Sequence, residues 1–141
     1  MLTSLEDIER FHSTDDPWSF NNNSYDLNRR EIIRGVIPER IYKQVLDIGC
    51  GQGFITQILP GENILGIDIS NEAIQKAKKH KSNTCKFQQN SIFDFEAKDK
   101  KYDLIIITGV LYKQYIGKSL NLIYDYLNSW LNIDGILISV H

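Results

Sequence analysis

Short, mostly apolar segments alternate with helical patterns along this sequence. Segments of four to six residues that are rich in apolar side chains are typical of strands buried on both faces of a parallel sheet. Five such segments lie at 45–48, 64–69, 84–89, 102–107 and 136–140. Apolar residues at helical spacing lie between them, over 71–81 and 118–131. The alternation predicts an α/β fold with a doubly wound parallel sheet and helices on both faces.

The first forty residues precede this alternation and form a leader. Residues 3–12 predict a short helix capped by Thr3 or Ser4. A polar loop follows that carries Trp18, an apolar side chain that loop formation alone does not explain. A second helix is expected over 25–36.

Three glycines at alternate positions, Gly49, Gly51 and Gly53, follow the first strand-like segment. A tight turn between a strand and a helix presents backbone N–H groups and the positive end of the helix dipole to a ligand. The spacing differs from the G-x-G-x-x-G turn of dinucleotide-binding domains, because Phe54 stands where the third glycine would be. The turn therefore predicts a small ligand that is at least partly anionic.

Two acidic residues narrow the choice of ligand. Asp47 ends the first strand, where it would repel a diphosphate but suits an ammonium group. Asp68 ends the second strand, about where an acid meets ribose hydroxyls in nucleotide-binding folds. S-adenosylmethionine carries a carboxylate, an ammonium group and a ribose, and so fits this pattern.

Segments 45–53 and 64–70 resemble the first two motifs of class I S-adenosylmethionine-dependent methyltransferases, and the similarity continues through 87–94, 102–112 and 131–140. The resemblance implies a sheet of strand order 3-2-1-4-5 and a ligand outside the carboxyl ends of strands 1, 2 and 4. An unliganded flavodoxin-like or Rossmann domain is the alternative. The strands 6 and 7 that are usual in the family have no counterpart in this sequence. Either the chain is truncated, a partner subunit or second copy completes the acceptor side, or the leader holds the acceptor.

The leader resembles that of the nodulation-type N-methyltransferases. Asp16-Pro17-Trp18, Ser24-Tyr25-Asp26 and Arg29 carry this likeness, with aspartate at 26 where that branch has glutamate. It implies that Trp18, Tyr25 and Arg29 close over the methionine end of the cofactor. The alternative is a helix packed on the sheet edge by its apolar residues.

The residues and the resemblance together predict a cofactor site. Its members are Trp18, Tyr25, Arg29, Asp47, Gly49, Cys50, Gly51, Asp68, Ile69, Ser91, Ile92 and Thr108. Ser91 stands where the family usually has an acid beside the adenine, and its hydroxyl would accept from the adenine amino group.

Two residues are predicted at the acceptor side, and one of them as a general base. Tyr112 follows the fourth strand and His141 ends the fifth, on the carboxyl edge that carries the glycine turn. An imidazole titrates near neutral pH and would take a proton from the acceptor. No metal is required for methyl transfer from a sulfonium, and no metal site is predicted.

Length and composition indicate the number of domains and exclude some classes of partner. With 141 residues the chain is one domain, a leader over 1–40 and a core over 41–141. A net charge of −2 gives no general attraction to nucleic acid, and no apolar run is long enough to span a membrane. Two cysteines form no disulfide framework, which indicates a cytoplasmic protein.

The predicted function is transfer of a methyl group to nitrogen or oxygen of a small-molecule acceptor. A non-catalytic S-adenosylmethionine-binding subunit or regulatory module that needs a partner is the alternative.

Overall fold

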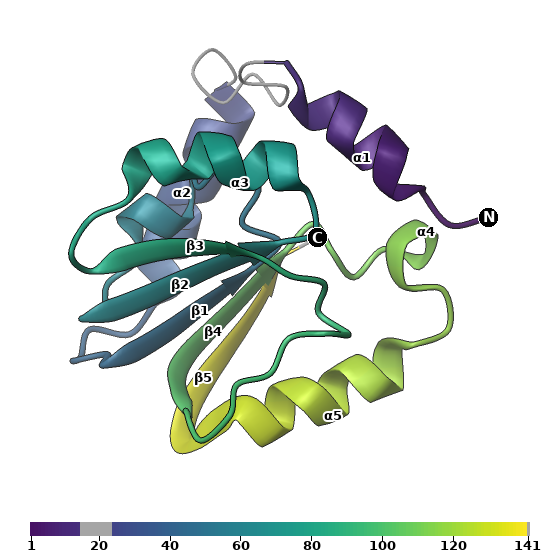
Figure 1. Ribbon diagram of the computed structural model, residues 1–141. Helices are drawn as coiled ribbons and strands as arrows, with labels where there is room; N and C mark the ends of the chain where they lie inside the picture. The colour runs from purple at the N-terminus through teal and green to yellow at the C-terminus, as the bar shows by residue number, and fades with distance from the viewer. Residues whose placement is uncertain (15–23, 141) are drawn as a thin grey trace.

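The structure is a computed structural model that describes residues 1–14 and 24–140, with side chains from residue 27 onward in the second segment. Its centre is a five-stranded sheet (Figure 1). The strands are β1 (Gln44–Ile48), β2 (Asn63–Asp68), β3 (Cys85–Gln89), β4 (Tyr102–Thr108) and β5 (Leu131–Val140). Their order is β3-β2-β1-β4-β5, and every neighbouring pair is parallel. This confirms the predicted fold class and strand order.

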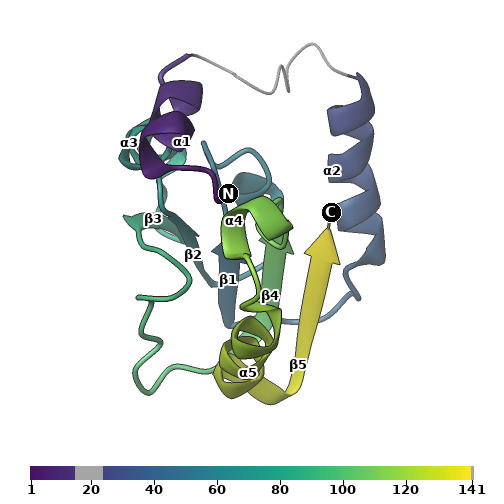
Figure 2. The same cartoon turned by 90° about the vertical axis from the view of Figure 1, so that its right-hand side faces the viewer.

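Helices cover both faces of the sheet. The α-helices are α1 (Leu5–His12), α2 (Ser24–Val36), α3 (Asn71–Ala77), α4 (Lys113–Ile116) and α5 (Leu120–Trp130), and two 3₁₀ turns are η1 (Thr56–Ile58) and η2 (Lys78–His80). Helices α2 and α3 lie on one face and α5 on the other (Figures 1 and 2). Helices α1 and α4 lie beyond the carboxyl ends of the strands, above the edge that the sequence predicts as the ligand site.

The core has two halves, one on each side of the sheet. Successive side chains of a strand point to opposite faces, so β4 serves both halves. Leu104 and Ile106 pack with α2 and α3, whereas Ile105 and Ile107 pack with α5. Trp130 of α5 is buried in the second half of the core and meets the ring of Phe95 edge-on at 5.1 Å.

The structure differs from the sequence-based expectations at two connections. The glycine turn leads into the three-residue η1 rather than an α-helix, because Pro60 leaves too few residues for a stable α-helix. Strand β5 begins at Leu131, earlier than predicted, and contains Asp134 and Gly135 in a register shift opposite β4. Within the described ranges, no helix is both long and apolar enough to cross a membrane.

Candidate functional site

A cavity of about 800 Å³ opens at the carboxyl ends of the strands. Its volume lies in the range of small-molecule sites, about 300–1,000 Å³. The loops that follow β1, β2, β3 and β4 contribute to its wall, together with α1, α2 and α4. The structure brings together the following predicted site residues in this wall: Arg29, Gly49, Cys50, Gly51, Asp68, Ile69, Ser91, Ile92, Thr108 and Tyr112.

All three glycines of the turn have left-handed backbone angles that other residues rarely adopt, Gly49 with φ +75°, Gly51 with φ +53° and Gly53 with φ +84°. A Cβ at Gly49 would lie 2.3 Å from Val110 Cγ2 and 2.8 Å from the Thr108 carbonyl oxygen. A Cβ at Gly51 would meet only His12 Cε1, at 3.7 Å. Gly49 is therefore required for packing, whereas Gly51 leaves bare backbone at the cavity wall.

The turn does not present its amides as the sequence suggests. The N–H groups of Gly49 and Cys50 both donate to the Ile67 carbonyl oxygen, at 2.9 and 3.0 Å. The Gly51 N–H donates to Asp68 Oδ2 at 2.9 Å, and the Gly53 N–H donates to the Cys50 carbonyl oxygen at 2.9 Å. The expectation of free amides is thus wrong for these four residues. Three of these hydrogen bonds join the turn to β2 and the fourth closes the turn on itself, so together they fix its shape.

Asp68 lies at the cavity wall at the end of β2. Its Oδ2 accepts from Gly51 and its Oδ1 accepts from the Ser70 amide, at 2.9 Å each. Burial raises the pKa of Asp68, although these two amides and nearby His12 favour the charged form. Each oxygen of a carboxylate has two lone pairs, so both oxygens can still accept from a ligand hydroxyl.

Asp47 differs from this arrangement, since it is fully buried and is not part of the cavity wall. The Thr56 hydroxyl donates to its Oδ2 at 2.6 Å, and its Oδ1 has no partner among the described residues. Burial raises the pKa of Asp47 to about 7; the Thr56 hydrogen bond opposes this rise and the charge of Asp68 adds to it. The geometry therefore does not support the predicted direct contact between Asp47 and a ligand ammonium.

The loops after β3 and β4 complete the wall. Ser91 Oγ accepts from the Phe93 amide at 3.1 Å, so one of its lone pairs is already used. Tyr112 precedes α4 and its side chain is 40% exposed. Its ring meets that of Tyr115 at 6.1 Å between centroids, and both residues line the cavity. The cavity is aromatic on this side.

Three of the predicted site residues lie outside the described part of the structure: Trp18, the side chain of Tyr25, and His141. Their roles stay predictions. For His141, the pH–rate profile of His141→Ala beside that of the parent chain is the test. Arg29 is described, and α2 places it at the cavity.

Sequence reasoning missed the contribution of α1. Leu5, Ile8, Phe11 and His12 all line the cavity. The helical spacing of the first three gives α1 one apolar face, but nothing in the sequence indicates which surface that face meets. His12 gave no signal at all. Among the described residues, no group of three side chains could hold a metal ion.

Comparison with known proteins accounts for this arrangement. The sequence model of a family described as "Methyltransferase domain" matches residues 42–141. The chain belongs to this family. A methyltransferase domain explains why the loops after successive strands meet at one cavity, and it confirms the resemblance found in the sequence.

Individual relatives give the same result. The chain is 27% identical to nodulation protein S of Azorhizobium caulinodans over 132 residues, which cover 85% of this chain and 59% of that one. It is 30% identical to a ubiquinone biosynthesis O-methyltransferase of Actinobacillus pleuropneumoniae over 105 residues, covering 67% of this chain and 44% of that one. The chain thus spans about half the length of these two relatives.

A solved structure matches most of the fold. The N-methyltransferase NodS of Bradyrhizobium japonicum, in complex with S-adenosyl-L-homocysteine, superposes with a TM-score of 0.83 at 25% identity. The match covers 96% of this chain and 71% of that chain. It therefore includes the leader as well as the sheet.

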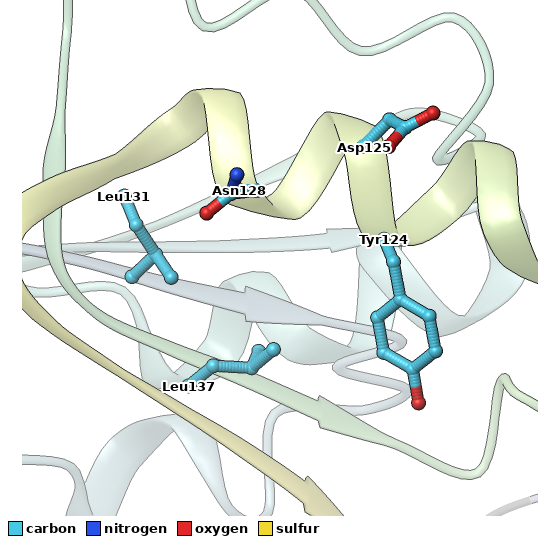
Figure 3. Close-up of a pocket in the computed structure, with 5 residues that line it drawn as sticks. All are labelled: Tyr124, Asp125, Asn128, Leu131 and Leu137. Carbon is cyan, nitrogen blue, oxygen red and sulfur yellow. The ribbon is translucent and has the colours of Figure 1, made fainter.

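A second, smaller hollow of about 340 Å³ lies between α5 and β5 (Figure 3). Tyr124, Asp125 and Asn128 reach it from α5, and Leu131 and Leu137 reach it from β5. Leu131 pairs with Tyr102, at the amino end of β4, so this hollow begins at the opposite end of the sheet from the glycine turn. Among the predicted site residues that the structure describes, none lines this hollow.

Proposed function

We propose that this chain is an S-adenosylmethionine-dependent methyltransferase that moves a methyl group to nitrogen of a small-molecule acceptor. The observation that carries the proposal is the junction of the glycine turn and Asp68 in one cavity, where the Gly51 amide donates to the Asp68 carboxylate. The family match supports methyl transfer, and the bound product in NodS supports the cofactor.

The cavity wall fits the parts of this cofactor. Asp68 retains lone pairs for the two ribose hydroxyls, and the bare backbone at Gly51 admits the ligand without a side chain in the way. Ile69 and Ile92 offer apolar surface on which the adenine would stack, beside Ser91. Thr108 ends β4 and Tyr112 follows this strand, where the methyl group would face the acceptor.

The chemistry asks the chain mainly to position its ligands. When bound, S-adenosylmethionine supplies an activated methyl group and a thioether leaving group. The residues after β4 would hold the acceptor nitrogen in line, about 3 Å from the methyl carbon. The aromatic pair Tyr112 and Tyr115 suits an amine, because a cation is attracted to the face of an aromatic ring. The amine must lose a proton before its lone pair can attack, and His141 is the proposed acceptor of that proton.

Nitrogen is favoured over oxygen by the extent of the similarity. Nodulation protein S matches the leader and the core, whereas the O-methyltransferase match covers only 67% of the chain. The leader contributes Arg29 and the face of α1 to the cavity. The leader, which contributes to the cavity wall, is therefore shared with the N-methyltransferase NodS.

Label transfer tests the proposal. Purified chain is incubated with methyl-labelled S-adenosylmethionine and a panel of amines and amino sugars, with alcohols of matched shape as controls. Labelled N-methyl product with at least one amine is expected, and its formation should fall in Asp68→Ala. Binding of S-adenosylhomocysteine with no labelled product would favour the non-catalytic module. Product from the alcohols alone would overturn the choice of nitrogen.

A further inference from the structure

Helix α1 is joined to the start of α3 by one side chain. The Glu9 carboxylate accepts from the Asn71 amide at 2.6 Å through Oε1, and from the Glu72 amide at 2.9 Å and the Ser70 hydroxyl at 2.8 Å through Oε2. Burial opposes ionisation of Glu9, but these hydrogen bonds outweigh it and lower the pKa of Glu9. The carboxylate therefore stays charged near neutral pH.

These bonds are not needed to begin α3. Ser70 already caps that helix, since its Oγ accepts from the Ala73 amide at 3.0 Å. At an exposed helix start, water would satisfy the amides of Asn71 and Glu72. Glu9 takes the place of that water, so the bonds fix the position of α1 more than the existence of α3.

The same residue connects Glu9 to the proposed ribose site. Ser70 is fully buried; its amide donates to Asp68 Oδ1 at 2.9 Å and its hydroxyl donates to Glu9. Two carboxylates are thus held by one serine. A displacement of the Glu9 carboxylate would therefore change the position of Ser70, and through Ser70 that of Asp68.

Further ties hold α1 at both ends. Lys76 Nζ donates to the carbonyl oxygens of His12 and Thr14, at 2.7 and 2.6 Å, at the end of α1. The Thr3 amide donates to the Gln114 carbonyl oxygen at 2.7 Å, which links the start of the leader to α4. Helix α1 therefore spans the cavity from α4 to α3, as both views show (Figures 1 and 2).

We propose that Glu9 is a positioning residue whose hydrogen bonds to the start of α3 hold α1 across the cofactor cavity and so set how long the cofactor stays bound. This inference rests on the proposed function, because the occupant of the cavity is taken to be S-adenosylmethionine or its product. The apolar face of α1 lines the cavity, so a ligand packed against this face loses those contacts when α1 moves away. Breaking the Glu9 bonds makes that movement easier.

The test is the dissociation rate of S-adenosylhomocysteine, measured by stopped-flow displacement. Glu9→Ala should raise this rate at least tenfold, and Glu9→Gln, which keeps one acceptor oxygen, should give a smaller rise. Glu6→Ala is the matched control on the same helix, because the Glu6 side chain is 84% exposed and forms an ion pair with Arg10 of the same helix. That control should change the rate less than twofold. A Glu9→Ala chain with a lower melting temperature but an unchanged dissociation rate would overturn the proposal.

A second variant and a second measurement keep the test decisive. Lys76→Met removes the tie at the end of α1 without touching the cap of α3, and it should also raise the dissociation rate. Hydrogen exchange over residues 5–12 of the ligand-free chain should become faster in Glu9→Ala and stay unchanged in Glu6→Ala. Unchanged exchange in Glu9→Ala would refute the hold on α1 while leaving the proposed function intact. Absence of S-adenosylhomocysteine binding by the parent chain would refute the proposed function and, with it, the role of Glu9 in retention.

Discussion

Asp47 and Asp68 lie near the ends of neighbouring parallel strands, yet their surroundings are opposite. Asp47 is sealed in the interior with the Thr56 hydroxyl as its partner. Asp68 lies at the cavity, and backbone amides hold both of its oxygens. The glycine turn shows the same contrast, since a Cβ at Gly49 would clash with Val110, whereas a Cβ at Gly51 would meet only His12, at an ordinary contact distance of 3.7 Å.

The contrast teaches that position on the carboxyl edge of a sheet does not by itself make a residue part of the site. The end of β1 is shaped by packing, and the end of β2 is open to a ligand. A carboxylate in the first region affects stability, whereas a carboxylate in the second affects binding. The predictions below separate the two regions on this basis.

The largest effect is expected from a methyl group on the packed side of the turn. Gly49→Ala should lower the free energy of unfolding by about 3 kcal/mol or more, from left-handed backbone strain and overpacking against Val110. Gly51→Ala should cost only about 1 kcal/mol of stability, from backbone strain. Urea unfolding of both variants measures this difference. Equal losses in the two variants would remove the distinction between the two sides of the turn.

The second prediction concerns ligand affinity. Asp68→Ala should weaken binding of S-adenosylhomocysteine by about 1.5–3 kcal/mol, the range for hydrogen bonds to a charged group. Asp47→Asn should leave the affinity within about threefold, because Asp47 does not line the cavity. Titration calorimetry on the two folded variants provides the comparison. A larger loss in Asp47→Asn than in Asp68→Ala would reverse the assignment.

The third prediction is the pH dependence of stability. The pKa of Asp47 is raised to about 7 in the folded chain, so an unfolded chain releases this proton at lower pH. Between about pH 4 and 7 the free energy of unfolding of the ligand-free chain should therefore fall as pH rises, by up to about 1.4 kcal/mol per pH unit. Below this window Asp47 is protonated in both states and does not destabilise the folded chain. Above the window Asp47 is ionised in both states, and the loss of stability is complete. Asp47→Asn should flatten the slope in a series of urea unfolding curves, and an equally steep slope in that variant would contradict the assignment to Asp47.

The smallest effect is expected at the aromatic side of the cavity. Tyr112→Phe keeps the ring beside Tyr115 and removes only a hydroxyl on a side chain that is 40% exposed. Water can replace that hydroxyl, so the activation free energy of methyl transfer should rise by no more than about 1 kcal/mol, which lowers the rate about fivefold. Tyr112→Ala is the matched variant without the ring and should lose more. Equal losses in the two variants would assign the role to the hydroxyl.

The sequence contained enough to predict the sheet and part of the cavity wall. Apolar segments of strand length and the spacing of Gly49, Gly51 and Asp68 depend on local chemistry, and the structure confirms the strand order. The burial of Asp47 could not be predicted from the sequence. It depends on the hydrogen bond from the Thr56 hydroxyl, and Thr56 reaches Asp47 from the short 3₁₀ turn that forms before Pro60.

The place of α1 was beyond reach for a different reason. It depends on hydrogen bonds between Glu9 and residues about sixty positions away. Helical spacing shows which face of α1 is apolar but not what that face covers. Contacts between residues so far apart in the sequence become visible only in the folded structure.

The most direct test of the central claim is a titration of isotope-labelled chain with S-adenosylhomocysteine, followed by amide nuclear magnetic resonance. The account predicts that the amide signals of Gly51, Ile69 and Ser91, at the cavity above the sheet, shift as ligand is added. The signals of Tyr124 and Leu137, at the hollow between α5 and β5, should stay in place. Shifts at Tyr124 and Leu137 without shifts at Gly51, or no shifts at saturating ligand, would contradict it.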